Sequence, residues 1–380
     1  LEEEKRKGLF EDILDNLAGY GPIQPLLNDP EISEIMVNGS DLVFIEKHGK
    51  LFETDIKFED NNHVLRVIDR ILNPLGLRVD LDFPTADARL PDGSRVNIVI
   101  PPVAHRGACI TIRKFLRNKL TLDDLVELGS LTPHMAEFLE ACVVSRLNII
   151  VSGNTSSGKT TMLNTLTNFI PDNERIVTIE DAAELQLSQR HWISLETRPA
   201  RVDGVGGIGT RELVRNVLRM RPDRIVVGEV RSGEALDMLQ AMNTGHDGSL
   251  TTLHANSPRD VISRLETMAL MAGVDLPVVA IRQQIAGAID LIVHMARLQD
   301  GTRKTTRITE VARMEGDIVT LSDIFTFEQE GIADDGMIIG DLIPTGIRPV
   351  FTPRLEVSGY KLSGEIFGAG VTKFNVEGPK

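Results

Sequence analysis

The chain has 380 residues, which is long enough for more than one domain with a buried core. Its formal net charge of −14 argues against a nucleic-acid groove as the main working surface, because such a groove gathers positive charge. Its 2 cysteines exclude a disulfide framework, and no run approaches the roughly 20 apolar residues that a membrane-spanning helix needs. We expect a cytosolic protein. The chain begins at Leu1 without a signal peptide, and we expect a further natural segment before it.

The first 118 residues have the pattern of a small α+β domain. Residues 1–20 are charged and then amphipathic at helical spacing, and Tyr20-Gly21-Pro22 ends that helix. Short alternating runs follow on both sides of a helix predicted over 61–75, which ends before Gly76. The predicted strands are 32–37, 43–47, 51–58, 85–90, 95–100 and 108–115. The first group of these runs predicts a small antiparallel sheet.

Arginines are dense in the second half of this region. They are Arg89, Arg95, Arg106, Arg113 and Arg117, in an otherwise acidic chain. Any single one of them can be an ordinary solvated strand residue. Together they indicate an anion close to this domain.

From residue 132 onward the pattern changes to alternating strands and helices. Residues 119–131 resemble a linker with one helical turn, and Thr132-Pro133 begins a helix with proline at its first position. The alternation that follows predicts a mostly parallel α/β sheet within a domain over 132–330. Its predicted strands are 148–152, 175–180, 192–196, 224–228, 249–254 and 289–294. A hairpin over 303–314 and 317–327 follows, and the tail over 331–380 is rich in glycine and proline.

The strand predicted over 148–152 leads directly into a complete phosphate-binding motif. Residues 153–160, GNTSSGKT, fit G-x-x-x-x-G-K-[ST] at every fixed position, and we call them the P-loop. Small residues let backbone N–H groups close around phosphate oxygens, Lys159 adds positive charge, and the Thr160 hydroxyl can ligate Mg²⁺. A helix beginning near Thr161 adds its N-terminal dipole. We predict binding of a nucleoside triphosphate by Gly153, Asn154, Thr155, Ser156, Ser157, Gly158, Lys159, Thr160 and Thr161.

Two apolar strands after the P-loop end in carboxylates, which hydrolysis of a nucleoside triphosphate requires. The strand over 225–228 delivers Glu229, a candidate for holding Mg²⁺. The strand over 176–179 delivers Glu180 and Asp181 at the C-terminal edge, where open α/β sheets bind their ligands. Capping of the next turn is the alternative role for Glu180 and Asp181.

Two histidines, His246 and His254, bracket another apolar strand. A lone histidine is often a buried core residue, but small residues flank both of these. Either could sense a γ-phosphate through a hydrogen bond, whereas a metal site is disfavoured because no further His or Cys has ligand spacing. The glycine-rich stretch 201–209 predicts a mobile loop rather than a second nucleotide site.

Four segments, in this order and spacing, resemble the conserved boxes of the type II/type IV secretion ATPases. GNTSSGKTT, TIEDAAELQL, MRPDRIVVGEVR and GHDGSLTTLHAN are similar to their Walker A, Asp box, Walker B and His box. YGPIQPLLNDPEISEIMVNG and DARLPDGSRVNIVIPP resemble the N-terminal domain of the Tad (Flp) pilus branch, the CpaF-like motors. The four-cysteine zinc motif of the type II branch is missing, and the tail matches the family only loosely.

This resemblance implies a RecA-like P-loop ATPase core preceded by a smaller α+β (PAS-like) domain. It implies a homo-hexamer in which the first domain folds back over the nucleotide, working on an inner-membrane platform at the cytoplasmic face. ATP and Mg²⁺ would be the cofactors, with Lys159 and Thr160 on the phosphates and metal, Glu229 ordering Mg²⁺ and Glu180 activating water. His246 and His254 match the His box. Arg89, Arg95 and Arg113 are candidates for clamping the phosphates from the N-terminal domain, in cis or across a subunit boundary.

Four functions compete on this basis. The first is a ring motor for Tad-type pilus assembly or retraction, or for secretion, that rotates its domains about residues 119–131. The second changes the cargo to conjugative type IV secretion or an archaeal filament. The third is a nucleotide-dependent switch or scaffold with little hydrolysis, which the carboxylates at two strand ends disfavour. The fourth is a RecA-like DNA translocase, which the acidic charge disfavours.

Overall fold

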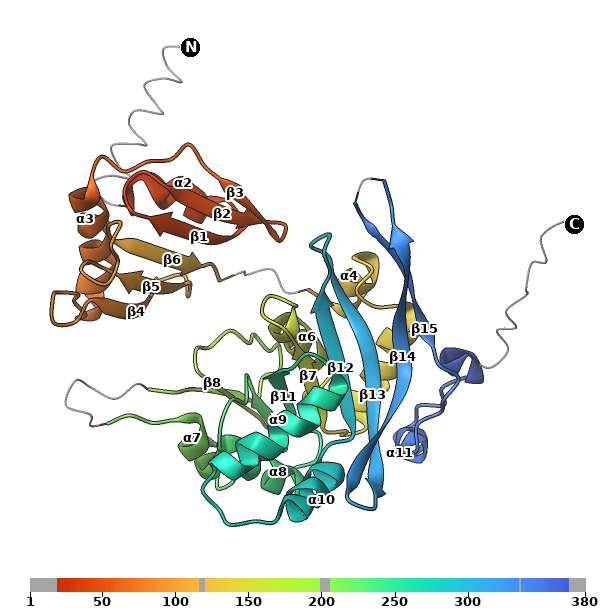
Figure 1. Ribbon diagram of the computed structural model, residues 1–380. Coiled ribbons are helices and arrows are strands. Elements are labelled where there is room, and N and C mark those ends of the chain that lie inside the picture. The colour runs from red at the N-terminus through yellow and green to blue at the C-terminus, as the bar shows by residue number, and fades with distance from the viewer. Residues whose placement is uncertain (1–18, 116–119, 199–205, 335, 369–380) are drawn as a thin grey trace, which may run out of the picture. The chain divides into compact units, whose positions relative to one another are not determined.

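The computed structural model describes residues 19–115, 120–198, 206–334 and 336–368. The chain forms two compact units, Leu1–Asn118 and Lys119–Lys380, and Figure 1 shows the elements of each. The amphipathic helix predicted before Tyr20 lies outside the described residues, as do Arg117 and most of the predicted loop over 201–209.

The described part of the first unit contains one six-stranded antiparallel sheet with the order β3-β2-β1-β6-β5-β4. Pairing of β1 with β6 joins the two predicted groups of strands into this small sheet. Its elements are η1 (Gly21–Ile23), α2 (Gln24–Asn28), β1 (Ile32–Asn38), β2 (Val43–Lys47), β3 (Lys50–Glu53), α3 (Asn61–Leu72), η2 (Asn73–Leu75), β4 (Thr85–Arg89), β5 (Arg95–Val99) and β6 (Cys109–Arg113).

One face of the small sheet packs against α3 (Figure 1). The helix begins where the Asp60 carboxylate accepts a hydrogen bond from the His63 N–H at 2.7 Å, and η2 ends at Gly76 with φ 67°. Because strand side chains alternate between faces, every second residue of the central strands is apolar and buried. This core includes Ile35, Val37, Val64, Ile68, Val96, Ile98, Ile110 and Ile112. The opposite face therefore carries the polar side chains of the same strands.

In the second unit, the described residues form a nine-stranded sheet with the order β15-β14-β13-β12-β7-β11-β10-β8-β9. The strands from β12 to β9 are parallel, and β13, β14 and β15 extend the sheet in antiparallel fashion. Its strands are β7 (Ile149–Gly153), β8 (Ile176–Glu180), β9 (Trp192–Glu196), β10 (Arg224–Val227), β11 (Leu250–His254), β12 (Leu291–Arg297), β13 (Arg303–Glu315), β14 (Ile318–Ile332) and β15 (Ile338–Pro344).

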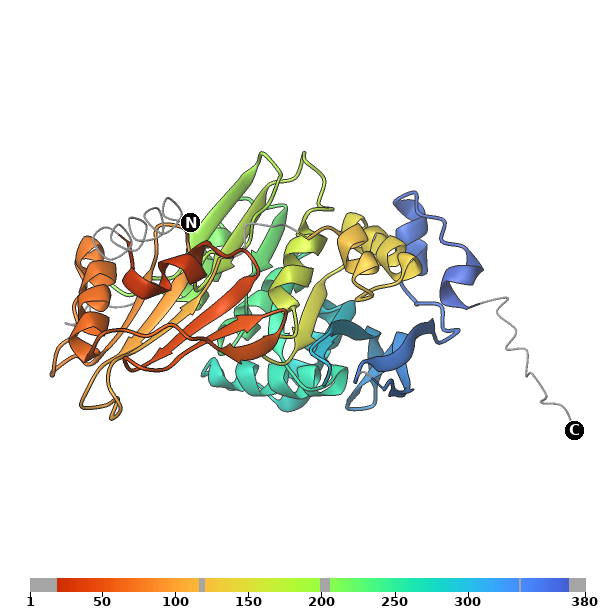
Figure 2. The same ribbon diagram turned by 90° about the horizontal axis from the view of Figure 1, so that it is seen from above.

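Helices cover both faces of this large sheet (Figures 1 and 2). A parallel strand covered on both faces is apolar at nearly every position, and Ile149 and Val151 pack on one side while Ile150 packs on the other. The helices are α4 (Leu122–Glu127), α5 (Pro133–Val144), α6 (Lys159–Thr167), α7 (Thr210–Val217), α8 (Glu234–Asn243), α9 (Pro258–Met271), α10 (Val278–Ala288), α11 (Thr352–Val357) and η3 (Gly364–Phe367).

The linker predicted over 119–131 is described from residue 120 onward, and residues 120–131 are packed into the second unit. A capping box between Thr121 and Asp124 begins α4, and Leu122, Leu125 and Leu131 belong to the same buried cluster as α5 and α6. This segment is therefore part of the second unit's core rather than a loose connection.

The glycine- and proline-rich tail also contributes to this core. β15 pairs with β14, and the ring of Phe138 on α5 lies 6.1 Å from Phe351 and 5.8 Å from Phe367, measured between centroids. Aromatic rings at this separation add to the stabilisation from burial. The described part of the tail therefore extends the large sheet and packs against α5.

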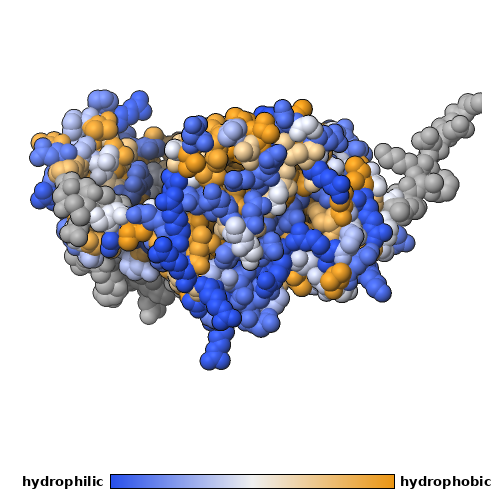
Figure 3. All heavy atoms as spheres, turned by 90° about the horizontal axis from the view of Figure 1, so that it is seen from below, coloured by the Kyte–Doolittle hydropathy of each residue, from blue (hydrophilic) through white to orange (hydrophobic). Residues whose placement is uncertain are grey.

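Among the described residues, no helix combines the length and apolar character needed to cross a membrane. Figure 3 shows hydrophobic and hydrophilic residues interspersed over one face of the molecule. Exposed large apolar side chains occur in several places, including Leu270, Met271, Val274 and Val278 around the connection of α9 to α10.

Candidate functional site

The predicted catalytic residues are delivered by neighbouring parallel strands. β7, β11, β10 and β8 lie side by side in the large sheet, so their carboxyl ends meet at one edge. β7 leads into the P-loop, β11 ends at His254, Glu229 follows β10, and β8 ends at Glu180. Register pairs His254 with Gly153 across β11 and β7. One edge of the sheet thus brings together most of the residues predicted from the motifs.

The backbone of the P-loop adopts the open conformation that its small residues permit. Gly153, Ser156 and Gly158 have φ values of 150°, 58° and 95°. A Cβ atom at Gly153 would lie 2.2 Å from the Met295 carbonyl oxygen, so a larger residue there would displace β12. Gly158 then caps the N-terminus of α6, whose first turn holds Thr160 and Thr161.

Two polar groups of the P-loop are suited to phosphate oxygens. The buried Ser157 hydroxyl has no hydrogen-bond partner among the described residues, and Lys159 Nζ donates to the Asn154 carbonyl oxygen at 2.9 Å inside the loop. A buried donor without an acceptor costs free energy, which an anionic ligand would recover. Together with the N-terminus of α6, these groups fit a nucleotide phosphate.

A continuous chain of polar contacts runs from the P-loop across three strand ends. Lys159 Nζ lies 3.4 Å from His254 Nδ1, and His254 Nε2 lies 3.1 Å from Glu229 Oε1. Arg231 donates to Glu229 Oε2 at 2.5 Å and to Asp181 Oδ2 at 3.3 Å. The carboxylate of Glu229 and the hydroxyl of Thr160 are oxygen donors of the kind that Mg²⁺ prefers, so the residues of this edge also fit that ion.

The protonation of His254 follows from its neighbours. Burial, and then the positive charge of Lys159, lower the pKa of its imidazole, so the ring is neutral near pH 7. An ammonium group can only donate a hydrogen bond, so Nδ1 is the acceptor and Nε2 carries the proton. His254 therefore lies between Lys159 and Glu229 and contacts both of them.

Glu180 is held apart from this chain in a dry environment. Its side chain is 4% exposed, and Oε1 accepts hydrogen bonds from the N–H groups of Glu184 at 2.9 Å and Leu185 at 3.0 Å. Within the described part of the chain, the buried Oε2 atom has no partner. Burial raises the pKa of this carboxyl to about 7. A Cβ atom at Gly228 would lie 2.9 Å from Glu180 Cγ, so a side chain at that position would push Glu180 aside.

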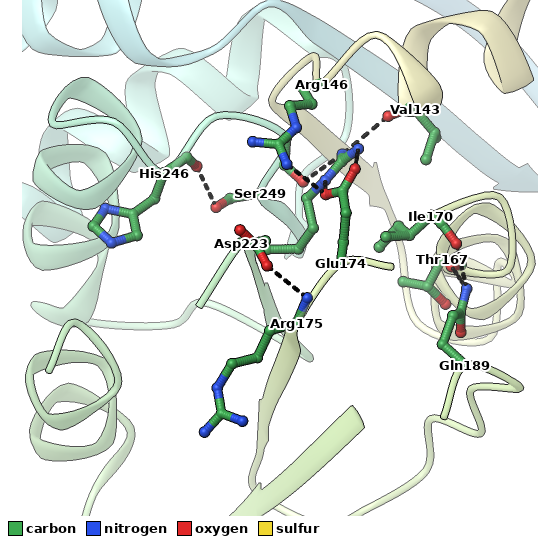
Figure 4. A network of polar contacts seen from close by, with 12 residues as sticks. Val143, Arg146, Thr167, Ile170, Glu174, Arg175, Gln189, Asp223, His246 and Ser249 are labelled. Atoms are coloured by element: carbon green, nitrogen blue, oxygen red, sulfur yellow. Dashed lines mark hydrogen bonds and ion pairs between the residues drawn. The ribbon is translucent and has the colours of Figure 1, made fainter. Parts of the chain in front are cut away.

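His246 is not brought to the P-loop. It precedes β11, whereas His254 ends it, and a five-residue strand separates its two ends by roughly 15 Å. His246 Nδ1 lies 3.3 Å from the Ala241 carbonyl oxygen, and its own carbonyl accepts a hydrogen bond from the Ser249 hydroxyl. Figure 4 shows His246 and Ser249 near the network around Glu174. Two residues that bracket one strand face opposite edges of the sheet, and this explains the difference from the prediction.

The candidate arginines of the first unit form one row across its small sheet. Register pairs Arg89 with Arg95 across β4 and β5, and Arg95 with Arg113 across β5 and β6. Arg113 in turn pairs with Glu34 on β1, with 3.8 Å between Arg113 Nε and Glu34 Oε1. The row lies on the face opposite α3. Neighbouring strands therefore present three cations together, with about 5 Å between the Cα atoms of paired residues.

Two arginines of the second unit were missed by the sequence analysis. Arg231 lies two residues after Glu229 in the segment MRPDRIVVGEVR, so its proximity to the carboxylate could have been inferred. Arg303 begins β13 and donates from Nε to the Ser156 carbonyl oxygen of the P-loop at 2.9 Å. Arg303 is 147 residues distant from Ser156 in the chain, and only the order of the strands brings the two together.

The sequence model of the family described as type II/IV secretion system protein matches residues 16–328. The chain belongs to this family. A putative conjugal transfer protein of Mycobacterium tuberculosis is 35% identical over 333 residues, which are 86% of this chain and 94% of that protein. The type IV secretion system protein VirB11 of Brucella suis is 32% identical over 318 residues, or 76% of this chain and 88% of VirB11.

A solved structure supports the fold assignment for this family member. The pilus retraction motor PilT with bound ADP superposes with a TM-score of 0.55 at 19% identity, covering 77% of this chain and 83% of PilT. The predicted fold class is confirmed: this is a mixed α/β protein whose sheets match those of PilT-type ATPases, which have an N-terminal domain and a RecA-like ATPase domain.

Proposed function

We propose that this chain is a subunit of an ATP-hydrolysing motor that powers a type II/IV-type secretion or pilus machine. The observation that carries the proposal is the meeting of Lys159, Glu229 and the buried Glu180 at one edge of the large sheet. A phosphate-binding loop alone indicates binding, whereas a base in a dry position beside it favours hydrolysis.

Each residue has a distinct part in the proposed reaction. MgATP supplies the phosphoanhydride bond that water cleaves. The P-loop backbone, Ser157 and Lys159 bind and orient the phosphates, and Thr160 with Glu229 would hold the metal ion. Glu180 accepts the proton of the attacking water. A carboxyl with a pKa of about 7 is ionised in a large fraction of molecules near neutral pH and is a stronger base than an exposed glutamate.

Two kinds of machine are candidates for the one that this motor drives. The relatives named as conjugal transfer protein and VirB11 favour a type IV secretion machine. The N-terminal segments resemble the Tad (Flp) pilus motors instead, and this stays a second candidate. In either case we propose a homo-hexamer at the cytoplasmic face of the inner membrane, acting on membrane platform proteins.

ATP turnover per subunit should depend on protein concentration if the sites are completed by a neighbouring subunit. Between about 10 nM and about 50 µM, we expect the specific activity to rise steeply and then level off as rings assemble. Light scattering on the same samples reports the assembly. Absence of turnover at every concentration, with rings present, would reject the motor and favour the switch; a constant rate from monomers would reject the shared site.

Replacing Arg89, Arg95 and Arg113 together by Gln should lower turnover by roughly 10³-fold, because arginines that neutralise a transferring phosphoryl group have effects of this size. The control is Arg66→Gln on α3, whose side chain pairs with Glu59 away from the row. Mixing the triple variant with inactive Lys159→Ala subunits then shows whether the arginines act on the nucleotide of their own chain or on that of a neighbouring subunit. Recovered turnover means that the arginines act across a subunit boundary, and no recovery means that they act within one chain.

A further inference from the structure

The first residues of β13 contact the P-loop from outside its own strand and helix. Arg303 Nε donates to the Ser156 carbonyl oxygen at 2.9 Å. The aliphatic part of the same side chain packs beside the loop, since a Cβ atom at Gly158 would lie 3.5 Å from Arg303 Cδ. One half-buried side chain therefore touches two positions of the P-loop.

Arg303 contacts the P-loop at Ser156, a residue other than glycine whose backbone has a positive φ. Ser156 has φ 58°, a left-handed conformation that a residue with a side chain adopts only when its surroundings stabilise it. A guanidinium that donates to the Ser156 carbonyl holds the following peptide plane, whose N–H, on Ser157, lies 3.3 Å from the Asn154 carbonyl oxygen. Arg303 thus stabilises the curvature on which phosphate binding depends.

The first residues of β13 are hydrogen-bonded to residues 129 and 130, through the backbone of Arg303 and Thr305 and through the side chain of Lys304. The Ser130 hydroxyl donates to the Arg303 carbonyl oxygen at 2.5 Å, and the Thr305 N–H donates to the Ser130 carbonyl oxygen at 3.0 Å. Lys304 Nζ donates to the Gly129 carbonyl oxygen at 2.9 Å. Ser130 is buried three residues after the end of α4, in the segment that follows the boundary between the two units.

We propose that Arg303 is a positioning residue for the P-loop and that residues 303–305 couple the segment over 120–131 to it. β13 is held between β12 and β14, so its first residues move together rather than independently. A displacement of Ser130 would shift the backbone of Arg303 and, with it, the guanidinium on Ser156. The consequence for hydrolysis rests on the proposed function, because it assumes that the P-loop binds ATP.

The test uses the full chain and two readouts, the dissociation constant of a fluorescent ATP analogue with Mg²⁺ and amide hydrogen exchange over residues 153–158. Arg303→Met should raise the dissociation constant about tenfold and speed exchange about tenfold, because it removes a charged donor but keeps the aliphatic stem. Arg303→Lys, which keeps the charge, should recover part of both. Ser130→Ala, which touches no P-loop atom, should speed exchange about threefold. Arg282→Met, which breaks an ion pair with Glu266 elsewhere, is the control and should change neither.

The outcomes separate the inference from the proposed function. Unchanged exchange and affinity in Arg303→Met would overturn the positioning role. Unchanged exchange in Ser130→Ala, beside a clear effect of Arg303→Met, would overturn the coupling. A wild-type protein that fails to bind the ATP analogue would reject the proposed function alone, since hydrogen exchange reports on the P-loop without any nucleotide.

Discussion

Replacing Glu180 by Gln should lower ATP turnover by roughly 10²–10⁴-fold, the usual loss when a general base is removed. Gln keeps the size of the side chain and can still accept at Oε1 the hydrogen bonds from Glu184 and Leu185. The fold should therefore persist, and nucleotide affinity should change little. Turnover measured under saturating MgATP checks the result. A variant that keeps more than a third of wild-type turnover would exclude Glu180 as the base.

The same substitution should change how stability depends on pH. The folded pKa of Glu180 is raised from 4.5 to about 7, so folding favours its protonated form. The corresponding stability is fully present below about pH 4.5 and is lost as the pH rises through about 7, in total about 3 kcal/mol. Wild-type protein should thus lose thermal stability over this window, by a Tm change of roughly 5–10 °C, and Glu180→Gln should lack this loss.

Glu196→Gln provides a matched control for both effects. Glu196 ends the neighbouring strand β9 in register with Glu180, but it is exposed. Its replacement should leave turnover close to that of the wild type and should move the pH window of the stability loss only slightly downward, because the charge of Glu196 is the smallest of the causes that raise the pKa of Glu180. If Glu180→Gln and Glu196→Gln have the same pH profile as the wild type, then the pKa of Glu180 is not raised in the folded protein.

Much of the second unit follows from local sequence. The runs 149–151 and 225–227 are apolar without alternation, which is typical of strands covered on both faces. A complete P-loop motif after the first of them predicts the edge that binds ligands. Glu180 and Glu229 follow two such runs directly. Their meeting with Lys159 at one edge could therefore be predicted from the direction of parallel strands alone.

Contacts between distant segments could not be predicted in this way. Pairing of β1 with β6 and the approach of Arg303 to Ser156 depend on strand order, which no local pattern records. The strand β15 was not predicted, because the glycines and prolines of the tail have low strand propensity. Pairing with β14 overrides that low propensity. For His246, the local motif predicted proximity to the phosphates, whereas the length of β11 places this residue at the edge of the sheet opposite the P-loop.

Replacing Arg224 by Met should destabilise the protein by about 3 kcal/mol, because buried Glu174 then keeps only the partly exposed Arg146 as an ion-pair partner and two buried carbonyl oxygens lose their donor. Arg224 is 0% exposed, and it donates to Glu174 from Nε at 2.6 Å and from Nη2 at 3.3 Å. It also donates from Nη1 to the carbonyl oxygens of Val143 at 2.9 Å and Gly248 at 3.2 Å. These contacts join the segments that precede three strands at the edge opposite the P-loop (Figure 4).

Thermal unfolding followed by circular dichroism should show a fall in Tm of roughly 10 °C for this variant. The control is Arg282→Met, which breaks a partly exposed pair with Glu266 and should cost less than about 1 kcal/mol. A loss for Arg224→Met no larger than that of the control would contradict the assigned role of the buried network.

The double variant Arg224→Met with Glu174→Gln identifies the source of the loss. Removing both charges leaves neither buried without a partner, and a buried pair contributes little net stability compared with neutral groups of similar volume. We therefore expect the double variant to recover more than half of the lost Tm. If it stays as unstable as the single variant, the loss lies instead in the carbonyls of Val143 and Gly248, which lack their donor in both proteins.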